Sequence, residues 1–192
     1  MLKDIAYLKL PRTGCDLDVF IDLEVLKSGS VNARPRQPDL ETKLEELTKR
    51  MEEYCNSDLG KDPYLPKPEE LCIALCPPYP QWFRAVLCEQ VGGAGGSMLR
   101  VCYLDYGNLD AVPVASVRKM LPEFVTALPA LALHVDIRGM PKDAPNEILA
   151  KAYAFMEGDD EGRGRLRVRN CECIGLGMYE ADAPELLAAL GV

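Results

Sequence analysis

The stretch Val-Cys-Tyr-Leu-Asp-Tyr-Gly-Asn at residues 101–108 constrains the fold more than any other part of the chain. In an extended strand Tyr103 and Asp105 point to one side, and the Gly107-Asn108 pair favours a bend directly after them. The bend brings Tyr106 toward the same end as Tyr103. Two such rings are suited to form part of a box for a cation. They are equally suited to cover a small core at a hairpin end, and the octapeptide alone leaves both interpretations open.

Short strand-like runs surround this stretch at close spacing. Alternation and β-branched content predict strands over residues 70–76, 82–90, 98–105 and 110–114, with a turn over 114–121. The glycine-rich segment 92–97 is expected to link two of them as a hairpin loop. It is not a phosphate-binding loop, since no Gly-Lys-Ser/Thr follows it. Together these runs predict a small, strongly bent barrel.

Further elements flank the barrel on both sides. On the N-terminal side we expect a strand over 16–27, a spacer over 28–38 and an amphipathic helix that begins at Asp39 as its N-cap and ends near Asn56. On the C-terminal side the pattern predicts strands over 130–137, 165–174 and 177–180, and helices over 145–156 and 184–190. The flanks therefore predict a second module, built from both ends of the chain, with the barrel inserted between them.

Composition narrows the classes of partner. The chain has 22 Lys and Arg against 30 Asp and Glu, for a net charge of −8, which argues against nucleic acid and favours basic partners. No apolar run approaches the roughly 20 residues of a membrane span, and no signal peptide is apparent, so no membrane association is expected. The eight cysteines lie mostly in apolar runs, which is typical of reduced thiols in a reducing compartment.

Four segments together resemble the Tudor domain family. They are Cys72-Ile-Ala, Trp82-Phe-Arg-Ala-Val, residues 101–108, and Val-Arg-Lys-Met-Leu-Pro at 117–122. With the flanking elements, the chain resembles an extended Tudor domain, in which a Tudor barrel is embedded in a staphylococcal-nuclease-like (OB) module. The resemblance implies a mostly β fold with some α, as one extended domain over 1–192. It implies a Tudor core at 68–125, the nuclease-like module at 1–38 plus 126–192, and a linking helix at 39–57.

The resemblance also implies a function. Extended Tudor domains bind arginine-rich, symmetrically dimethylated tails of PIWI-clade Argonautes in piRNA silencing, and reside in cytoplasmic, perinuclear germ granules (nuage). Carried over residue by residue, the cage consists of Phe83, Tyr103 and Tyr106, with Asn108 as the amide that binds the guanidinium. The fourth aromatic position falls at Cys76, which has no π-face.

Two further residues near the implied cage are candidates. Tyr79, in the Pro77-Pro78-Tyr79-Pro80 loop, is the candidate replacement for the missing ring. Asp105 is a possible site residue, although a structural role that orients groups at the hairpin end is favoured. Trp82 is expected in the core, and Arg84 at the surface or in an intramolecular ion pair.

Catalysis and metal binding are disfavoured. Asp16, Asp18, Asp22 and Glu24 cluster in sequence, as a metal-dependent nuclease requires, but no arginine constellation accompanies them in the sequence. The spacings Cys72-x3-Cys76 and Cys171-x-Cys173 lie within predicted strands and fit zinc poorly. The single histidine, His134, is expected to be structural. No catalytic residue, metal or cofactor is therefore expected.

Three functional alternatives stay open. An incomplete cage is compatible with binding of unmethylated peptide or with a scaffold role toward other germ-granule proteins. Self-association is a variant of that scaffold role. A single-stranded RNA platform on the OB-like module would need a basic groove, and Lys and Arg are not visibly clustered.

Overall fold

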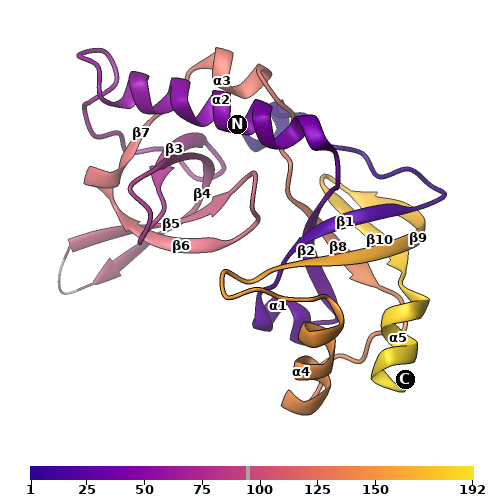
Figure 1. Cartoon of the computed structure of the whole chain (residues 1–192). Coiled ribbons are helices and arrows are strands. Elements are labelled where there is room, and N and C mark those ends of the chain that lie inside the picture. Colours follow the sequence, from indigo (N-terminus) through magenta and orange to yellow (C-terminus); the bar gives the residue numbers. More distant parts are fainter. Residues whose placement is uncertain (94–95) are drawn as a thin grey trace. The chain divides into compact units, whose positions relative to one another are not determined.

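The computed structural model describes residues 1–93 and 96–192 and divides the chain into two compact units. The first unit comprises Met1–Ala6 and Gln37–Ala130, and the second comprises Tyr7–Arg36 and Leu131–Val192. The second unit is thus built from two segments that flank Gln37–Ala130 in the sequence (Figure 1). The expected fold class, mostly β with some α, is confirmed.

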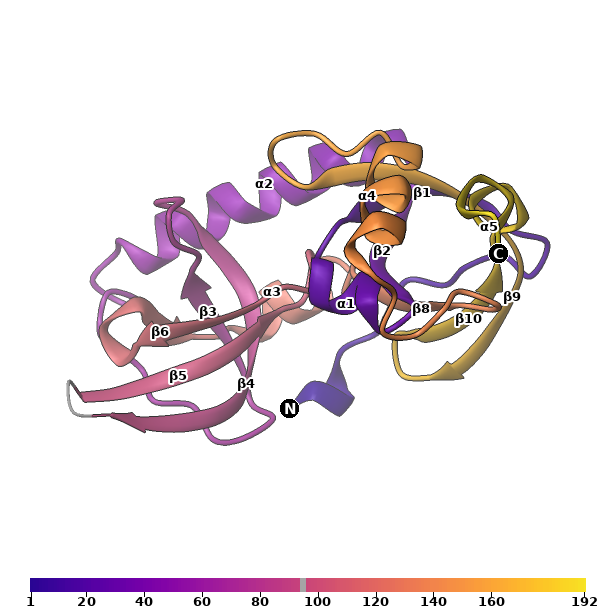
Figure 2. The same cartoon turned by 90° about the horizontal axis from the view of Figure 1, so that it is seen from below.

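The first unit contains a five-stranded antiparallel sheet in the order β6-β5-β4-β3-β7. The strands are β3 Leu71–Leu75, β4 Trp82–Gly93, β5 Gly96–Tyr103, β6 Leu109–Pro113 and β7 Val117–Lys119. β4 and β5 pair over almost their whole length as a long hairpin (Figure 2), and the expected glycine loop at its tip falls partly outside the described residues. Helix α2 (Pro38–Cys55), helix α3 (Pro122–Thr126), and the 3₁₀ turns η1 (Leu2–Asp4) and η2 (Val114–Ser116) complete the unit.

Alternation along the strands gives the first unit its core. Phe83, Ala85 and Leu87 share one face of β4 and pack with Leu99, Val101 and Tyr103 of β5 inside the curved sheet. Trp82 is buried, as expected, and the guanidinium of Arg118 lies 4.6 Å from its ring centroid. Helix α2 buries Leu40, Leu44, Leu47, Met51 and Cys55, which lie on one helical face.

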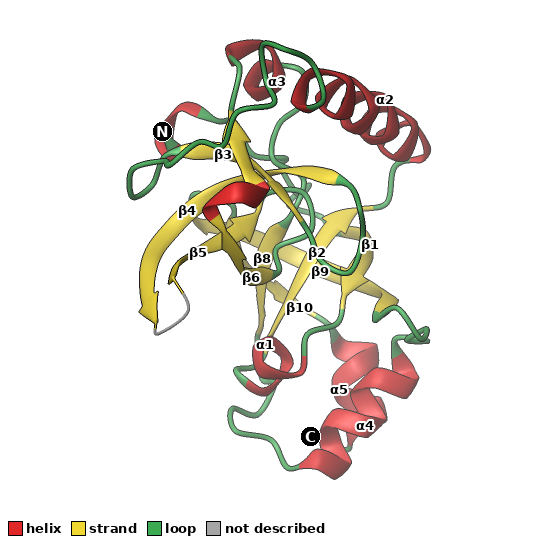
Figure 3. Cartoon of the chain, turned by 90° about the vertical axis from the view of Figure 1, so that its left-hand side faces the viewer, coloured by secondary structure: helices red, strands yellow, loops and turns green. Residues whose placement is uncertain are grey.

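The second unit is a closed five-stranded barrel in the order β1-β2-β8-β10-β9. Its strands are β1 Cys15–Phe20, β2 Ser30–Pro35, β8 Leu133–Ile137, β9 Arg163–Gly175 and β10 Met178–Asp182. Helices α1 (Leu23–Lys27), α4 (Asn146–Phe155) and α5 (Pro184–Leu190) lie together at one end of this barrel (Figure 3). Leu17 and Val19 of β1 point inward to meet Leu166 and Val168 of β9 in the barrel core.

Several predicted elements were wrong. The strand expected over 16–27 ends at Phe20, because the Asp22 carboxylate accepts hydrogen bonds from the N–H groups of Glu24 and Val25 and starts helix α1. The spacer expected over 28–38 contains strand β2, which is wholly buried because β1 and β8 pair with its two edges. Helix α2 begins with Gln37 as N-cap and Pro38 in the first turn, not at Asp39.

The two units also divide the chain differently from the expected boundaries. Residues Met1–Ala6 group with the first unit, where the Leu2 N–H donates to the Glu69 carbonyl at 2.8 Å and the Ala130 N–H donates to the Ala6 carbonyl at 2.7 Å. Helix α2 belongs to this unit as well, since it packs on β4, and does not form a separate link.

Candidate functional site

Three aromatic rings meet at one end of the first unit's sheet. Phe83 of β4 contacts the ring of Tyr103 at 6.1 Å between centroids and that of Tyr106 at 5.3 Å. The interplanar angles are 81° and 85°, so both pairs meet edge to face, an arrangement that aromatic quadrupoles favour. The structure therefore brings together the three rings that the sequence predicted as cage residues.

The turn after β5 places Tyr106 and Asn108. The N–H of Gly107 donates to the Tyr103 carbonyl at 2.7 Å, and the N–H of Tyr103 donates to the Asn108 carbonyl at 3.0 Å. Gly107 has φ +82°, in the left-handed region where glycine is favoured. This tight turn folds Tyr106 back against Phe83, as the Tyr-Gly-Asn pattern predicted.

The three rings differ in exposure. Tyr103 is only 1% exposed, and its hydroxyl donates to the Leu75 carbonyl at 2.5 Å. Burial, with a smaller contribution from the neighbouring Cys76, raises the pKa of Tyr103 well above its ordinary value. Phe83 is 8% exposed, whereas Tyr106 is half-buried. Tyr103 and Phe83 thus belong to the core of the first unit, and Tyr106 is the most exposed of the three rings.

Cys76 lies where the resemblance expects a fourth ring. The Asn108 side-chain amide donates to the Cys76 sulfur at 3.7 Å, so the two predicted residues are in contact. Burial raises the pKa of the Cys76 thiol, and the hydrogen bond from Asn108 offsets part of that shift. A thiol whose pKa lies above 9.0 is neutral at pH 7, so Cys76 supplies neither a π-face nor a negative charge to the site.

The loop after Cys76 holds Tyr79 at the surface. The Tyr79 N–H donates to the Cys76 carbonyl at 2.8 Å, and the Cys76 N–H donates to the Gln81 carbonyl at 3.4 Å. The Tyr79 side chain is 51% exposed. The structure therefore places Tyr79 beside the site but not packed into it.

Asp105 serves the scaffold and not the cage. Its two carboxylate oxygens accept from Arg84 Nη2 at 2.5 Å and Nε at 3.0 Å, in an ion pair whose side chains are 0% and 1% exposed. The remaining Arg84 N–H groups donate to the carbonyls of Phe124, Leu128 and Pro129. The inclusion of Asp105 among possible peptide-binding residues is corrected, because a buried pair with five hydrogen bonds cannot release its carboxylate without a large penalty.

Sequence reasoning did not anticipate how deeply this pair is buried. The signal was present: Arg84 lies on the same strand face as the buried Trp82 and Val86. An arginine at such a position needs a buried acceptor, and Asp105 is the acid nearest to the paired strand end.

The acidic cluster expected near the N-terminus does not form one site. Asp22 caps helix α1, whereas Asp16 and Asp18 project from β1. Arginines do accompany the latter two, because Arg36 Nε donates to Asp18 at 2.9 Å and Arg167 Nε lies 4.0 Å from Asp16. The expectation that no arginines accompany these acids was wrong, since strand pairing brings together residues distant in sequence.

Residues suited to bind a metal ion are not clustered within residues 1–93 and 96–192. In that part of the chain no group of three or more His, Cys, Asp or Glu residues could hold a metal ion. His134 lies between Asn32, at 3.2 Å from Nδ1, and Asp136, at 3.3 Å from Nε2. Among the described helices none combines the length and the apolar character needed to cross a membrane.

Known structures share this fold. The chain aligns with the extended Tudor domain TD3 of mouse TDRD1, solved with a MILI peptide containing dimethylarginine, at a TM-score of 0.74 and 20% identity over 92% of this chain and 85% of that one. It also aligns with the extended Tudor domain of Drosophila melanogaster Papi, solved with a methylated N-terminal Piwi peptide. This alignment has a TM-score of 0.66 and 14% identity, and it covers 85% of this chain and 81% of the Papi chain. At these identities the likeness establishes the fold alone.

Sequence comparison gives the family. Human Tudor domain-containing protein 1 is 29% identical over 119 residues, which is 62% of this chain and 10% of that protein. The Drosophila melanogaster protein vreteno is 28% identical over 109 residues, 57% of this chain and 15% of that protein. The chain therefore spans only a small part of the length of these relatives. The sequence profile of the Tudor domain matches residues 24–139, more than half of the chain, and the chain belongs to the Tudor domain family, with the fold of an extended Tudor domain.

Proposed function

We propose that the chain is a non-enzymatic adaptor domain that binds arginine-rich peptides through the cage formed by Phe83, Tyr103, Tyr106 and Asn108. The observation that carries the proposal is the convergence of three edge-to-face rings with a side-chain amide at one end of the sheet. Ring faces attract a guanidinium by about 0.5–2 kcal/mol each when desolvated. The Asn108 amide supplies a polar group that orients the guanidinium plane.

The proposed ligand carries symmetric dimethylarginine. Methylation keeps the guanidinium charge but removes N–H donors and adds apolar surface, which suits aromatic walls. The proposed source is the N-terminal tail of a PIWI-clade Argonaute, in piRNA silencing, within cytoplasmic, perinuclear germ granules. Support comes from the fold neighbours solved with methylated MILI and Piwi peptides and from the net charge of −8, which favours encounter with basic segments.

A second candidate is the binding of unmethylated arginine by the same site. Cys76 favours it, because a cage with three rings holds the added methyl groups with less contact area. The Papi domain, a fold neighbour, was also solved with an unmethylated Piwi peptide.

Calorimetric titration separates the two candidates. The chain is titrated with one arginine-rich peptide in its unmethylated and its symmetrically dimethylated forms. We expect micromolar affinity for the methylated form and at least a threefold preference for it, about 0.7 kcal/mol. A preference for the methylated peptide below about twofold would favour the second candidate, in which the site binds unmethylated arginine.

A cage variant locates the site. Tyr106→Ala removes the most exposed ring and is expected to weaken binding at least tenfold, while far-UV circular dichroism stays unchanged because this side chain is only half-buried. Tyr153→Ala, which removes a half-buried tyrosine from α4, is the matched control and should bind like the unmodified chain. Equal loss in both variants, or none in Tyr106→Ala, contradicts the proposed site.

A further inference from the structure

A row of arginines follows the outer face of strand β9. Arg163, Arg165, Arg167 and Arg169 are all exposed and alternate with the buried residues Gly164, Leu166 and Val168. Because alternate side chains of a strand share one side, the four arginines project from the outside of the closed barrel. The alternation Arg-x-Arg-x-Arg-x-Arg is visible in the sequence, so the earlier expectation that basic residues are not clustered was wrong.

The four arginines differ in their acidic partners. Arg163 pairs with Glu161 at 3.1 Å, and Arg169 pairs with Glu185. Arg167 has only Asp16, at 4.0 Å. Within residues 1–93 and 96–192, no carboxylate oxygen lies within 4.0 Å of the Arg165 guanidinium. In the middle of the row, the positive charges of Arg165 and Arg167 are therefore neutralised less by neighbouring carboxylates than those of Arg163 and Arg169.

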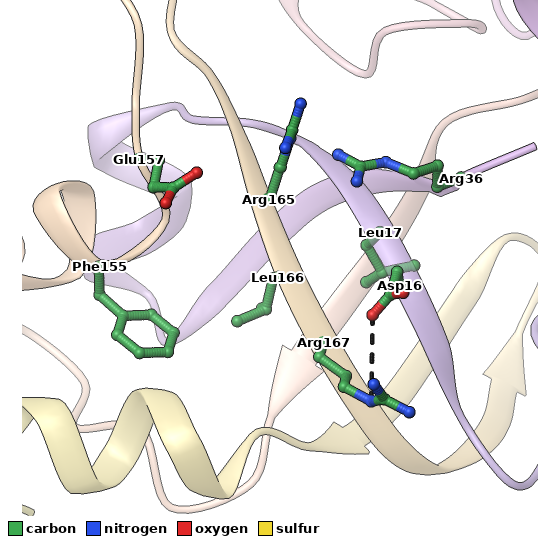
Figure 4. A pocket seen from close by; sticks show the side chains of 8 residues that line it. All are labelled: Asp16, Leu17, Arg36, Phe155, Glu157, Arg165, Leu166 and Arg167. Carbon is green, nitrogen blue, oxygen red and sulfur yellow. Dashed lines mark ion pairs between the residues drawn. The ribbon is translucent and has the colours of Figure 1, made fainter.

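The middle of the row also lines a pocket of about 310 Å³ in the second unit. Figure 4 shows the Arg36 and Arg165 side chains on the same side of the paired strands, with the Glu157 carboxylate facing Arg165. Strand pairing explains the arrangement, since Arg165 lies opposite Asp18 and Arg167 opposite Asp16 across β1 and β9.

The pocket has an aromatic edge that is held in place. Phe155, the last residue of α4, lines it and is 37% exposed. The Arg165 N–H donates to the carbonyl of Met156 at 2.7 Å, which fixes the end of α4 beside β9. Leu17 and Leu166 also line the pocket, but their side chains are buried in the barrel core.

We propose that this pocket binds a nucleoside monophosphate group, either free or at the end of a single-stranded RNA. Guanidinium groups bind phosphate oxygens through charge-assisted, often bidentate hydrogen bonds. Of the three arginines that line the pocket, Arg165 is the one without an ion-pair partner among the described residues. Arg36 pairs with Asp18 at 2.9 Å, and Arg167 lies 4.0 Å from Asp16. An exposed phenylalanine ring offers a stacking surface for a base, which contributes about 1–3 kcal/mol per stacked base in single-strand binders. The volume lies at the lower end of the range for small-ligand pockets, so it fits one nucleotide.

The residues around the pocket favour binding of a single terminal nucleotide over binding of a long RNA segment. The outer arginines of the row are neutralised by Glu161 and Glu185, so they offer little to further phosphates. An acidic peptide is less suited, because its carboxylate side chains bring no planar ring to Phe155.

Glu157 gives the proposal a sharp prediction. Its carboxylate faces Arg165 and repels a bound phosphate, so Glu157→Gln should strengthen binding about two- to threefold without changing the side-chain size. Arg165→Gln should weaken binding at least fivefold through loss of a charge-assisted contact. A purely structural role of these residues would not produce opposite effects.

The test is fluorescence anisotropy at low salt with the full chain and a labelled hexauridylate that carries a 5′-phosphate. We expect binding that is at least fivefold weaker for the same RNA without the phosphate, and competition by uridine monophosphate, which shows that the free nucleotide shares the site. Competition by unlabelled phosphorylated RNA but not by the nucleotide restricts the site to RNA ends and also supports the proposal.

Two control variants separate the pocket from general charge. Arg100→Gln changes the net charge equally but lies on the first unit, in an exposed pair with Glu89. Arg169→Gln removes an arginine of the same row outside the pocket. Both should bind within twofold of the unmodified chain. No binding at low salt, equal effects of all three arginine substitutions, or tighter binding of a phosphoserine peptide than of the phosphorylated RNA would overturn the proposal.

Discussion

Cys76 lies at the position where the proposed cage lacks a fourth aromatic ring. Its replacement by an aromatic residue tests how much a fourth ring contributes to the affinity for the peptide. Cys76→Phe is expected to raise the affinity for a symmetrically dimethylated peptide about three- to tenfold, because one additional ring face contributes roughly 0.7–1.4 kcal/mol. Calorimetric titration measures the change. The preference for the methylated over the unmethylated peptide should increase as well, since the ring contacts the methyl groups.

A second cysteine provides the control for this substitution. Cys88 is exposed on β4 in the same unit, so Cys88→Phe adds the same ring away from the cage. Its affinity should stay within twofold of the unmodified chain. An unchanged affinity in a folded Cys76→Phe variant would show that the position at Cys76 does not contact the ligand.

At the scale of elements, Arg84 joins strand β4 to the turn after β5 and to the segment that includes α3. Arg84→Met removes five hydrogen bonds and leaves the Asp105 carboxylate buried without its cation. Loss of one partner of a buried pair typically costs about 3–5 kcal/mol. We expect the free energy of unfolding, measured by urea denaturation, to fall by that amount.

The double substitution distinguishes the charge from the packing. Arg84→Met combined with Asp105→Leu removes both charges, and it should recover part of the lost stability because no ion then remains buried. A double variant that is less stable than Arg84→Met alone would mean that Asp105 has a second stabilising role.

The connection before β3 contains a pH-sensitive contact. The Glu70 carboxylate accepts from the Lys67 N–H at 2.7 Å and from the Tyr64 hydroxyl at 2.6 Å. These two hydrogen bonds lower the pKa of Glu70 below 4.5, and the bond from the Lys67 N–H makes the larger contribution. The hydrogen bond to Glu70 also raises the pKa of Tyr64 to about 12. Because the pKa of Glu70 is lower in the folded state, its carboxylate stabilises the fold above about pH 4.5, and this stabilisation is lost as the pH falls through the folded pKa.

Glu70→Gln tests this contact. At pH 7 the variant should be less stable by about 1 kcal/mol, a value reduced from that of a buried charged hydrogen bond because solvent screens this one. The difference between the two proteins should shrink as the pH is lowered from 5 toward 3, as followed by urea denaturation at each pH. A difference that persists at pH 3 would assign the effect to packing.

The elements differ in how far the sequence could predict them. The Trp82-Phe83 strand and the Tyr-Gly-Asn turn were predictable because local alternation and turn chemistry determine them. Strand β2 was not, since its sequence, which ends in Arg-Pro, forms a strand only where β1 and β8 pair with both of its edges. The pocket beside Arg165 was hidden for the same reason, because its residues come together only through strand pairing.

At the scale of the whole molecule, the segment Gln37–Ala130 of the first unit is inserted in the sequence of the second unit. Strands β2 and β8 are paired antiparallel, with Ala33 opposite Leu133, so the chain leaves the second unit and returns to it at the same end of this strand pair. When the first unit is folded, its structure fixes the positions of Gln37 and Ala130, the residues that follow Arg36 and precede Leu131 in the chain. When it unfolds, the second unit must close a disordered loop of roughly ninety residues, at an entropic cost of up to about 4 kcal/mol.

This topology predicts an asymmetric coupling of stability. Trp82 is the single tryptophan, so its fluorescence reports on the first unit, and labelling of the buried Cys171 reports on the second. Arg84→Met should lower the urea midpoint of both signals, because unfolding of the first unit lengthens the loop that the second must close. Leu17→Ala, in the core of the second unit, should lower the Cys171 midpoint more than the Trp82 midpoint, since the segment Gln37–Ala130 is continuous. Equal shifts of both signals in both variants would instead mean that the two units unfold as one cooperative body.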